Sequence, residues 1–122
     1  MERVLITGVV EHGRRFGRTL GFPTANMAVP EDVAAEDGVY ASRVGVDGVT
    51  YRAMSNLGRN PSVGGSVRHL ETYLFDFTGS LYGRELQVEL LQKIRDERSF
   101  ASVEELRRQI ERDKEFILKE LI

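Results

Sequence analysis

Residues 38–57 read GVYASRVGVDGVTYRAMSNL, and this stretch decides the fold. Its two halves, 38–46 and 49–57, are rich in the β-branched and aromatic residues that are typical of strands. The dipeptide between them, Asp47-Gly48, tolerates the positive φ angles of a tight two-residue turn. The stretch therefore predicts an antiparallel β-hairpin.

Similar runs lie on both sides of this hairpin, at 4–10, 67–77 and 86–95, with turn residues at 78–80 and at Gly83. The segment 12–37 contains three glycines and two prolines and is interpreted as an irregular connection, of a length that is typical of functional loops. The pattern predicts five or six antiparallel strands. A sheet of that size removes its exposed edges when it closes into a small barrel.

From Ser102 onward the apolar residues recur at helical spacing. Ser102 followed by Glu105 forms a capping box, which marks the start of a helix. The apolar face consists of Val103, Leu106, Ile110, Ile117 and Leu121. The charged residues between them are most simply a solvated face, so the tail predicts a helix that packs on the barrel.

The composition fits one soluble globular domain, with 122 residues of which 41% are hydrophobic and 30% charged. The formal charge of −2 argues against a nucleic-acid-binding domain, which usually carries a basic excess. The absence of Cys excludes disulfides, thiolate metal sites and a cysteine nucleophile. The first apolar run ends at Gly8, too short for a signal peptide or a membrane span, so a cytoplasmic location is expected.

The first candidate site lies at residues 12–26, which read HGRRFGRTLGFPTAN. Its glycines allow close backbone curvature, and three arginines add positive charge, a combination suited to phosphate. The Lys-Ser/Thr ending of a P-loop is missing, and an ordinary basic connection explains the composition equally well. Thr24 and Asn26, two residues apart, could present neutral oxygens to a magnesium ion that arrives with a nucleotide, or could be simple turn or capping residues.

The second candidate is Glu71, in the predicted strand at 67–77. Side chains alternate along a strand, so Glu71 shares a face with His69, Tyr73 and Phe75. A carboxylate among aromatic rings could serve as a general base. The competing interpretation is a salt-bridged surface glutamate on an edge strand, and His69 is interpreted as an ordinary histidine.

A third stretch, 94–100, reads IRDERSF. Arg95, Arg98 and Phe100 could flank a flat ring with one aromatic face and cationic edges. Phe100 could equally be a core residue that precedes the helix.

Taken together, these stretches resemble the riboflavin kinase family, including the kinase module of bacterial bifunctional riboflavin kinase/FMN adenylyltransferases. The resemblance covers nearly the whole chain, and the PTAN tetrapeptide is its most specific part. The motifs are GVVEHGRRFGRTLGFPTAN from Gly8, GVYA from Gly38, NLGRNP from Asn56, LETYLFDF from Leu70, LYG from Leu81 and IRDERSF from Ile94.

The resemblance implies a six-stranded antiparallel Greek-key β-barrel with a C-terminal α-helix. It also implies transfer of the γ-phosphoryl group of ATP to the ribityl 5′-hydroxyl of riboflavin, giving FMN and ADP, with Mg²⁺ brought by ATP. Glu71 matches the catalytic acidic residue of the family. The resemblance assigns ATP contacts to Gly13, Arg18, Thr24, Asn26, Leu74, Asp76 and Tyr82, magnesium to Thr24 and Asn26, and flavin contacts to Arg95, Arg98 and Phe100.

The chain departs from the family at a few positions. Many members have His in place of Tyr73, an Asp near Gly79-Ser80, and Arg-Pro-Thr in place of residues 60–62. Neither histidine lies in an H-x-G-H nucleotidyl-transfer signature, so residues 1–122 are expected to form a single kinase domain without an adenylyltransferase domain, with FMN as the end product.

Two other interpretations stay open from the sequence. One is a non-catalytic flavin- or nucleotide-binding barrel, and the other is a small barrel that binds single-stranded nucleic acid, which the charge disfavours. A monomer without nucleic-acid or membrane partners is the expected state.

Overall fold

The computed structural model describes residues 3–11, 24–62 and 65–121. Within these residues there are six strands, one α-helix and a final π-helical turn. In chain order these are β1 (Val4–Val9), β2 (Thr24–Ala28), β3 (Gly38–Val46), β4 (Val49–Ser62), β5 (Gly65–Leu74), β6 (Glu85–Arg95), α2 (Val103–Phe116) and η1 (Ile117–Leu121).

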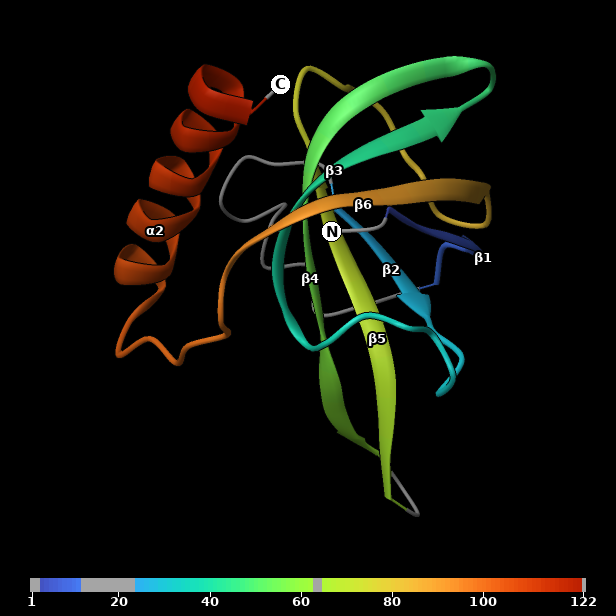
Figure 1. The fold of residues 1–122 in the computed structure, drawn as a ribbon, viewed down its shortest axis with the longest axis horizontal. Helices are drawn as coiled ribbons and strands as arrows, with labels where there is room; N and C mark the ends of the chain where they lie inside the picture. The colour runs from blue at the N-terminus through green and yellow to red at the C-terminus, as the bar shows by residue number, and fades with distance from the viewer. Residues whose placement is uncertain (1–2, 12–23, 63–64, 122) are drawn as a thin grey trace.

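The six strands form one antiparallel sheet in the order β1-β6-β3-β4-β5-β2. The sheet curls into a half-barrel, with the long β4 and β5 ribbon projecting from one end (Figure 1). Its edge strands approach each other where the Glu11 amide donates to the Asn26 carbonyl at 2.7 Å, an isolated antiparallel bridge. The expected mainly β fold of six antiparallel strands with a C-terminal helix is confirmed.

The β3–β4 hairpin forms as the sequence predicts. Val46 pairs with Val49, and the two turn residues, Asp47 and Gly48, have φ angles of 50° and 81°. Two positive φ angles match the right-handed twist of the flanking strands, which explains the Asp-Gly dipeptide.

Three strand predictions differ from the structure. The strand predicted at 49–57 continues as β4 to Ser62. Residues 24–28, which the sequence pattern assigns to an irregular connection, form β2, because their backbone pairs with β5. The run predicted at 67–77 ends as a strand at Leu74. Asp76 has a φ of 61°, a left-handed conformation that a strand does not accommodate.

The inner face of the sheet holds the main core, which includes Tyr40, Leu57, Leu70, Leu74, Leu86 and Leu90. Three hydroxyl groups form a hydrogen-bonded chain within this apolar interior. Ser42 Oγ lies 2.8 Å from Ser55 Oγ, which lies 2.8 Å from Thr72 Oγ1. Because each is fully buried, the hydroxyls satisfy one another across β3, β4 and β5.

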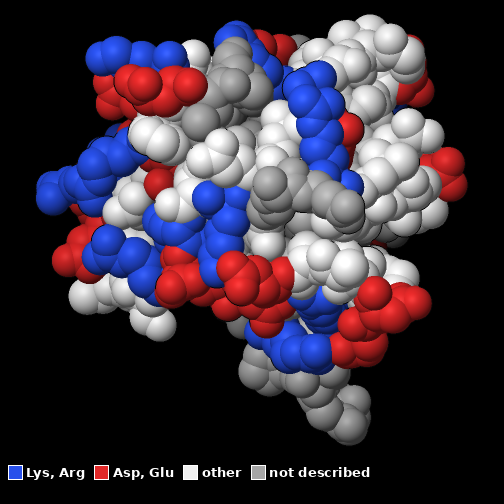
Figure 2. Space-filling view, in the orientation of Figure 1, with Lys and Arg blue, Asp and Glu red and all other residues white. Residues whose placement is uncertain are grey.

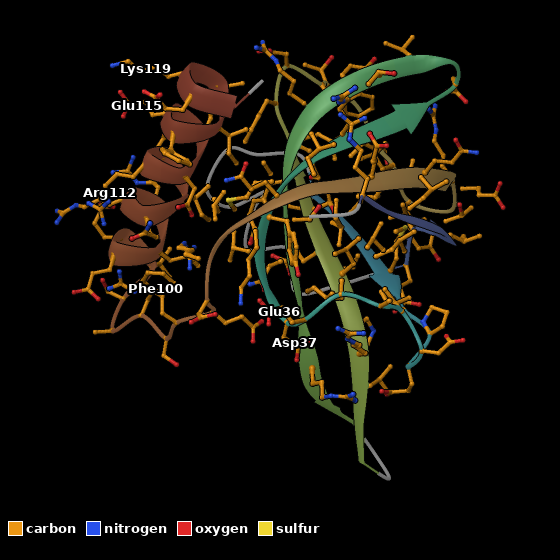
Figure 3. All side chains as sticks on the ribbon, viewed as in Figure 1. Glu36, Asp37, Phe100, Arg112, Glu115 and Lys119 are labelled. Carbon is orange, nitrogen blue, oxygen red and sulfur yellow. The ribbon has the colours of Figure 1, made fainter. Side chains whose placement is uncertain are left out.

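A second, smaller core lies on the outer face of the sheet, beneath α2. Ser102 caps this helix, with its Oγ accepting from the Glu105 amide at 3.1 Å, as the capping box predicts. Ile110 and Ile117 are buried against the sheet, whereas Arg112, Glu115 and Lys119 point away from it (Figure 3). The second core also contains Val39, Ala41, Met54, Tyr73 and Phe75.

No helix in the described part of the chain is both long and apolar enough to span a membrane. On the face shown in Figure 2, Lys and Arg side chains are interspersed with Asp and Glu rather than gathered into a patch of one sign.

Candidate active site

Glu71 lies at the centre of the candidate site, on β5. This strand is flanked by β2 and β4, and Glu71 is in register with Asn26 on one side and Asn56 on the other. Directly paired residues of antiparallel strands point to the same face, with Cβ atoms about 5 Å apart. The carboxylate therefore stands between two side-chain amides on the outer face of the sheet.

Thr24 joins this group from β2. It lies two residues before Asn26, so both side chains point to the outer face, and it is in register with Tyr73. Asn26 is 7% exposed, and Thr24 is partly buried. The structure thus brings Thr24, Asn26 and Glu71 together from segments more than 40 residues apart in sequence.

These residues suit a metal that brings its own charge. A hydroxyl and an amide oxygen are hard but neutral ligands, and a divalent cation binds such a pair well only with anionic ligands beside it. Among the residues that the structure describes, no group of three or more His, Asp or Glu side chains is placed to hold a metal ion. A hydroxyl and an amide oxygen would thus suit a divalent cation that is already bound to phosphate.

The Glu71 carboxylate is held by a neighbouring side chain. The Tyr73 hydroxyl donates a hydrogen bond to Glu71 Oε1, and Glu71 forms no ion pair within the described residues. β5 is also not an edge strand. The competing interpretation of Glu71, as a salt-bridged glutamate at a sheet edge, therefore does not fit the structure.

Glu71 belongs to a row of paired residues, one on each neighbouring strand, that runs across the sheet to Arg95. Asn56 is in register with Val39, and Val39 with Arg95 at the end of β6. Three strand spacings of about 4.8 Å separate Glu71 from Arg95, about 14 Å in all. The backbones of Arg95 and Glu71 thus lie three strands apart on the same face of the sheet.

Arg95 is fixed to the helix by an ion pair. Its Nη2 lies 2.8 Å from Asp113 Oδ2, and the Asp113 side chain is only 6% exposed. Arg98 lies farther along, with Nη1 3.1 Å from Gln109 Oε1 and its guanidinium 4.8 Å from the centroid of the Phe100 ring. Phe100 is half-buried near the start of α2 (Figure 3). The three predicted flavin contacts therefore gather where β6 meets the helix.

The predicted ATP contacts fall into three groups. Leu74 is 1% exposed in the main core, so only its backbone can face a ligand. Asp76 and Tyr82 are exposed beyond the end of β5, where Asp76 Oδ2 lies 3.4 Å from Arg52 Nη2. Gly13 and Arg18 lie outside the described residues.

Sequence reasoning missed Asn56 as a site residue. Its Oδ1 atom is buried and has no hydrogen-bond partner within the described structure, although a buried polar atom normally has one. Asn56 is a polar residue that stands two positions from Met54 on the packed outer face of β4. A polar residue two positions from the buried Met54, on the part of this face that is packed, is the signal that could have identified it.

His69 lies outside the site chemistry. Its Nε2 lies 2.9 Å from Glu11 Oε1, and its Nδ1 lies 3.2 Å from the Val67 carbonyl oxygen. Both ring nitrogens have partners, as the interpretation of an ordinary histidine requires.

Comparison with known proteins places the whole chain in one family. The family model described as flavokinase, riboflavin kinase, matches residues 1–121. The bifunctional riboflavin kinase/FMN adenylyltransferase of Escherichia coli strain K12 is 46% identical over 109 residues, which are 88% of this chain and 35% of that protein. The protein of the same name from Haemophilus influenzae is 42% identical over 111 residues, 90% of this chain and 36% of its own length. The chain thus spans about a third of the length of these relatives.

Two solved structures share the fold. One, described as a macrolide-efflux protein from Streptococcus pneumoniae, has a TM-score of 0.84 and 37% identity, covering 94% of this chain and 38% of that one. The other, a riboflavin kinase from Trypanosoma brucei, has a TM-score of 0.63 and 24% identity, covering 98% of this chain and 83% of that one. At that identity the second likeness concerns the fold alone.

Proposed function

Because this chain belongs to the riboflavin kinase family, we propose that it transfers the γ-phosphoryl group of ATP to the ribityl 5′-hydroxyl of riboflavin, giving FMN and ADP. One observation carries the proposal. Thr24, Asn26 and Glu71 lie on one face of two paired strands, with Asn26 in register with Glu71. An acid and two neutral oxygen donors at this spacing suit the meeting of an alcohol with a metal-bound triphosphate.

In this reaction Glu71 acts as the general base. One oxygen of its carboxylate accepts the proton of the ribityl hydroxyl while the alcohol oxygen forms a bond to the γ-phosphorus. The bond between that phosphorus and the bridging oxygen of ADP breaks, and ADP leaves with the electron pair. Glu71 then releases its proton to solvent.

Thr24 and Asn26 hold the metal in this proposal. A magnesium ion brought with ATP would bind their side-chain oxygens and neutralise charge on the phosphate oxygens. Gly13 and Arg18 would contact the phosphates, and Leu74, Asp76 and Tyr82 would line the rest of the nucleotide site. The support for Asp76 and Tyr82 is their exposed position beyond the end of β5.

The flavin ring would bind near Arg95, Arg98 and Phe100. The spacing of about 14 Å along the row from Glu71 to Arg95 suits a long substrate whose reacting end lies at Glu71 and whose flat ring lies near the helix. The Phe100 ring and the two guanidinium groups offer stacking and hydrogen-bonding partners for such a ring.

We also propose that residues 1–122 act as one monomeric domain in the cytoplasm, which supplies the ATP. Both cores of the described residues are built on the two faces of one sheet, which supports a single folding unit.

The proposal is tested by incubating the protein with ATP, magnesium and riboflavin and separating the flavins by chromatography. FMN should form, and Glu71→Gln should lower turnover by about 10²-fold with riboflavin binding retained, the range expected for a positioned general base. Glu89→Gln is the matched control, since Glu89 is a partly exposed strand glutamate on β6. Bound but unchanged riboflavin would instead indicate a binding module, and unaltered turnover in Glu71→Gln would remove Glu71 from the mechanism.

A further inference from the structure

Tyr73 makes a direct contact with the proposed base. The two residues lie two positions apart on β5, so both side chains stand on the outer face of the sheet. The Tyr73 hydroxyl donates to Oε1 of Glu71. This hydrogen bond holds Oε1 in place. Because both oxygens belong to one planar carboxylate, it also defines where the other oxygen lies.

The Tyr73 ring is held firmly. It is 5% exposed and belongs to the outer core, where it packs with Met54 and Val39 from the sheet and Ile110 and Ile117 from the C-terminal helical segment. Protein cores are packed closely enough that such a ring has one stable position. The hydroxyl is therefore a fixed donor to Glu71.

The protonation state of Tyr73 fits this role. Burial raises the pKa of the Tyr73 hydroxyl far above its ordinary value, and the Glu71 charge and the hydrogen bond raise it further. The Arg95 guanidinium opposes the increase only in part. Tyr73 consequently keeps its proton, and remains a donor, at any pH at which the protein would work.

We propose that Tyr73 is a positioning residue, which holds Glu71 Oε1 so that Oε2 faces the substrate hydroxyl. The inference rests on the proposed kinase function and deepens it. A freely rotating carboxylate would spend most of its time in unproductive orientations, and holding one oxygen from a packed ring removes that freedom before substrate binds. The effect should appear in turnover more than in substrate binding, because the hydroxyl that Tyr73 contributes is bonded to the base.

The first test is Tyr73→Phe, which removes the hydroxyl and keeps the ring. We expect kcat to fall about 10-fold, while KM for ATP and for riboflavin changes less than about 2-fold. The matched control is Tyr40→Phe, on the inner face of the sheet. Tyr40 is 1% exposed and donates to the Glu36 carbonyl at 2.6 Å, so this variant also loses the hydrogen bond of a buried tyrosine. Its kcat should equal that of the unaltered protein.

The second test separates positioning from structural support. If Tyr73 acts through Glu71, adding Tyr73→Phe to Glu71→Gln should change the remaining kcat less than about 2-fold. An equal loss in both backgrounds, or a full kcat in Tyr73→Phe, would overturn the inference. If the unaltered protein forms no FMN, the proposed function fails instead, so the two failures are distinct.

Discussion

The ion pair between Arg95 and Asp113 gives the sharpest stability prediction. Arg95 Nε lies 3.2 Å from each Asp113 carboxylate oxygen, and Nη2 lies 2.8 Å from Oδ2. Gln109 Nε2 adds a fourth contact at 2.9 Å. Because the Arg95 and Asp113 side chains are 20% and 6% exposed, this pair joins β6 to α2 in a largely dry environment.

Asp113→Asn removes the charge and keeps the size of the side chain. Removing one partner of a fully buried pair costs about 3–5 kcal/mol. Solvent screens Arg95 in part, and the new amide oxygen can still accept one hydrogen bond, so we expect a loss of about 2–3 kcal/mol. For a domain of this size that corresponds to a fall in Tm of about 10 °C.

The assay is urea and thermal unfolding followed by circular dichroism, since the chain contains no Trp to report by fluorescence. Arg107→Gln is the matched control, because Arg107 forms an exposed ion pair with Glu104 on the same helix. The unfolding midpoint of this variant should equal that of the unaltered protein. Replacing both partners, Arg95→Met with Asp113→Leu, should recover most of the stability. A loss below about 0.5 kcal/mol in Asp113→Asn would refute the reasoning, since that is what an exposed pair contributes.

Three further predictions concern the metal, the pH and the backbone. Calorimetry should detect Mg²⁺ binding only with ATP or ADP present, because Thr24 and Asn26 are neutral; tight binding by the protein alone would contradict the metal assignment. The raised pKa of Tyr73 means that the folded chain holds this proton more tightly than the unfolded chain, so the urea midpoint of unfolding should fall as the pH rises above about 10. The fall should be less steep in Tyr73→Phe. An equally steep fall in both proteins would count against the raised pKa. Gly38→Ala should cost about 1–3 kcal/mol in urea unfolding, because φ is 152° and the new Cβ would lie 3.0 Å from the Arg95 carbonyl oxygen. Gly58→Ala should lower the unfolding free energy less than Gly38→Ala does, since the new Cβ would meet only the movable carboxylate of Glu97. A larger loss in Gly58→Ala than in Gly38→Ala would exclude backbone strain as the explanation.

Local patterns predicted the parts of the fold that local chemistry determines. The Asp47-Gly48 turn and the Ser102 cap form where the sequence places them, because turn and cap residues act within a few positions. β2 was not predicted, because its five residues carry no periodic signal and become a strand only by pairing with β5.

The same limit applies to the candidate site. The two-residue spacing placed Thr24 with Asn26, and alternation along a predicted strand placed Glu71 with Tyr73, but only the pairing of distant strands brings the two pairs side by side. The helical pattern does give partial information about Asp113. It is an acidic residue between Ile110 and Ile117 on the apolar stripe of the helix, a position that implies a buried cationic partner without identifying Arg95.

The three buried hydroxyls also help to determine the register in which the strands pair. Ser42, Ser55 and Thr72 can satisfy one another in only one registration of β3, β4 and β5. A slip of β5 by one residue would turn Thr72 outward and bring Glu71 into the apolar interior, leaving the hydroxyls and a charge without partners. The interior thus discriminates against misaligned sheets, and the alignment that it selects is the one that sets Glu71 beside Asn26.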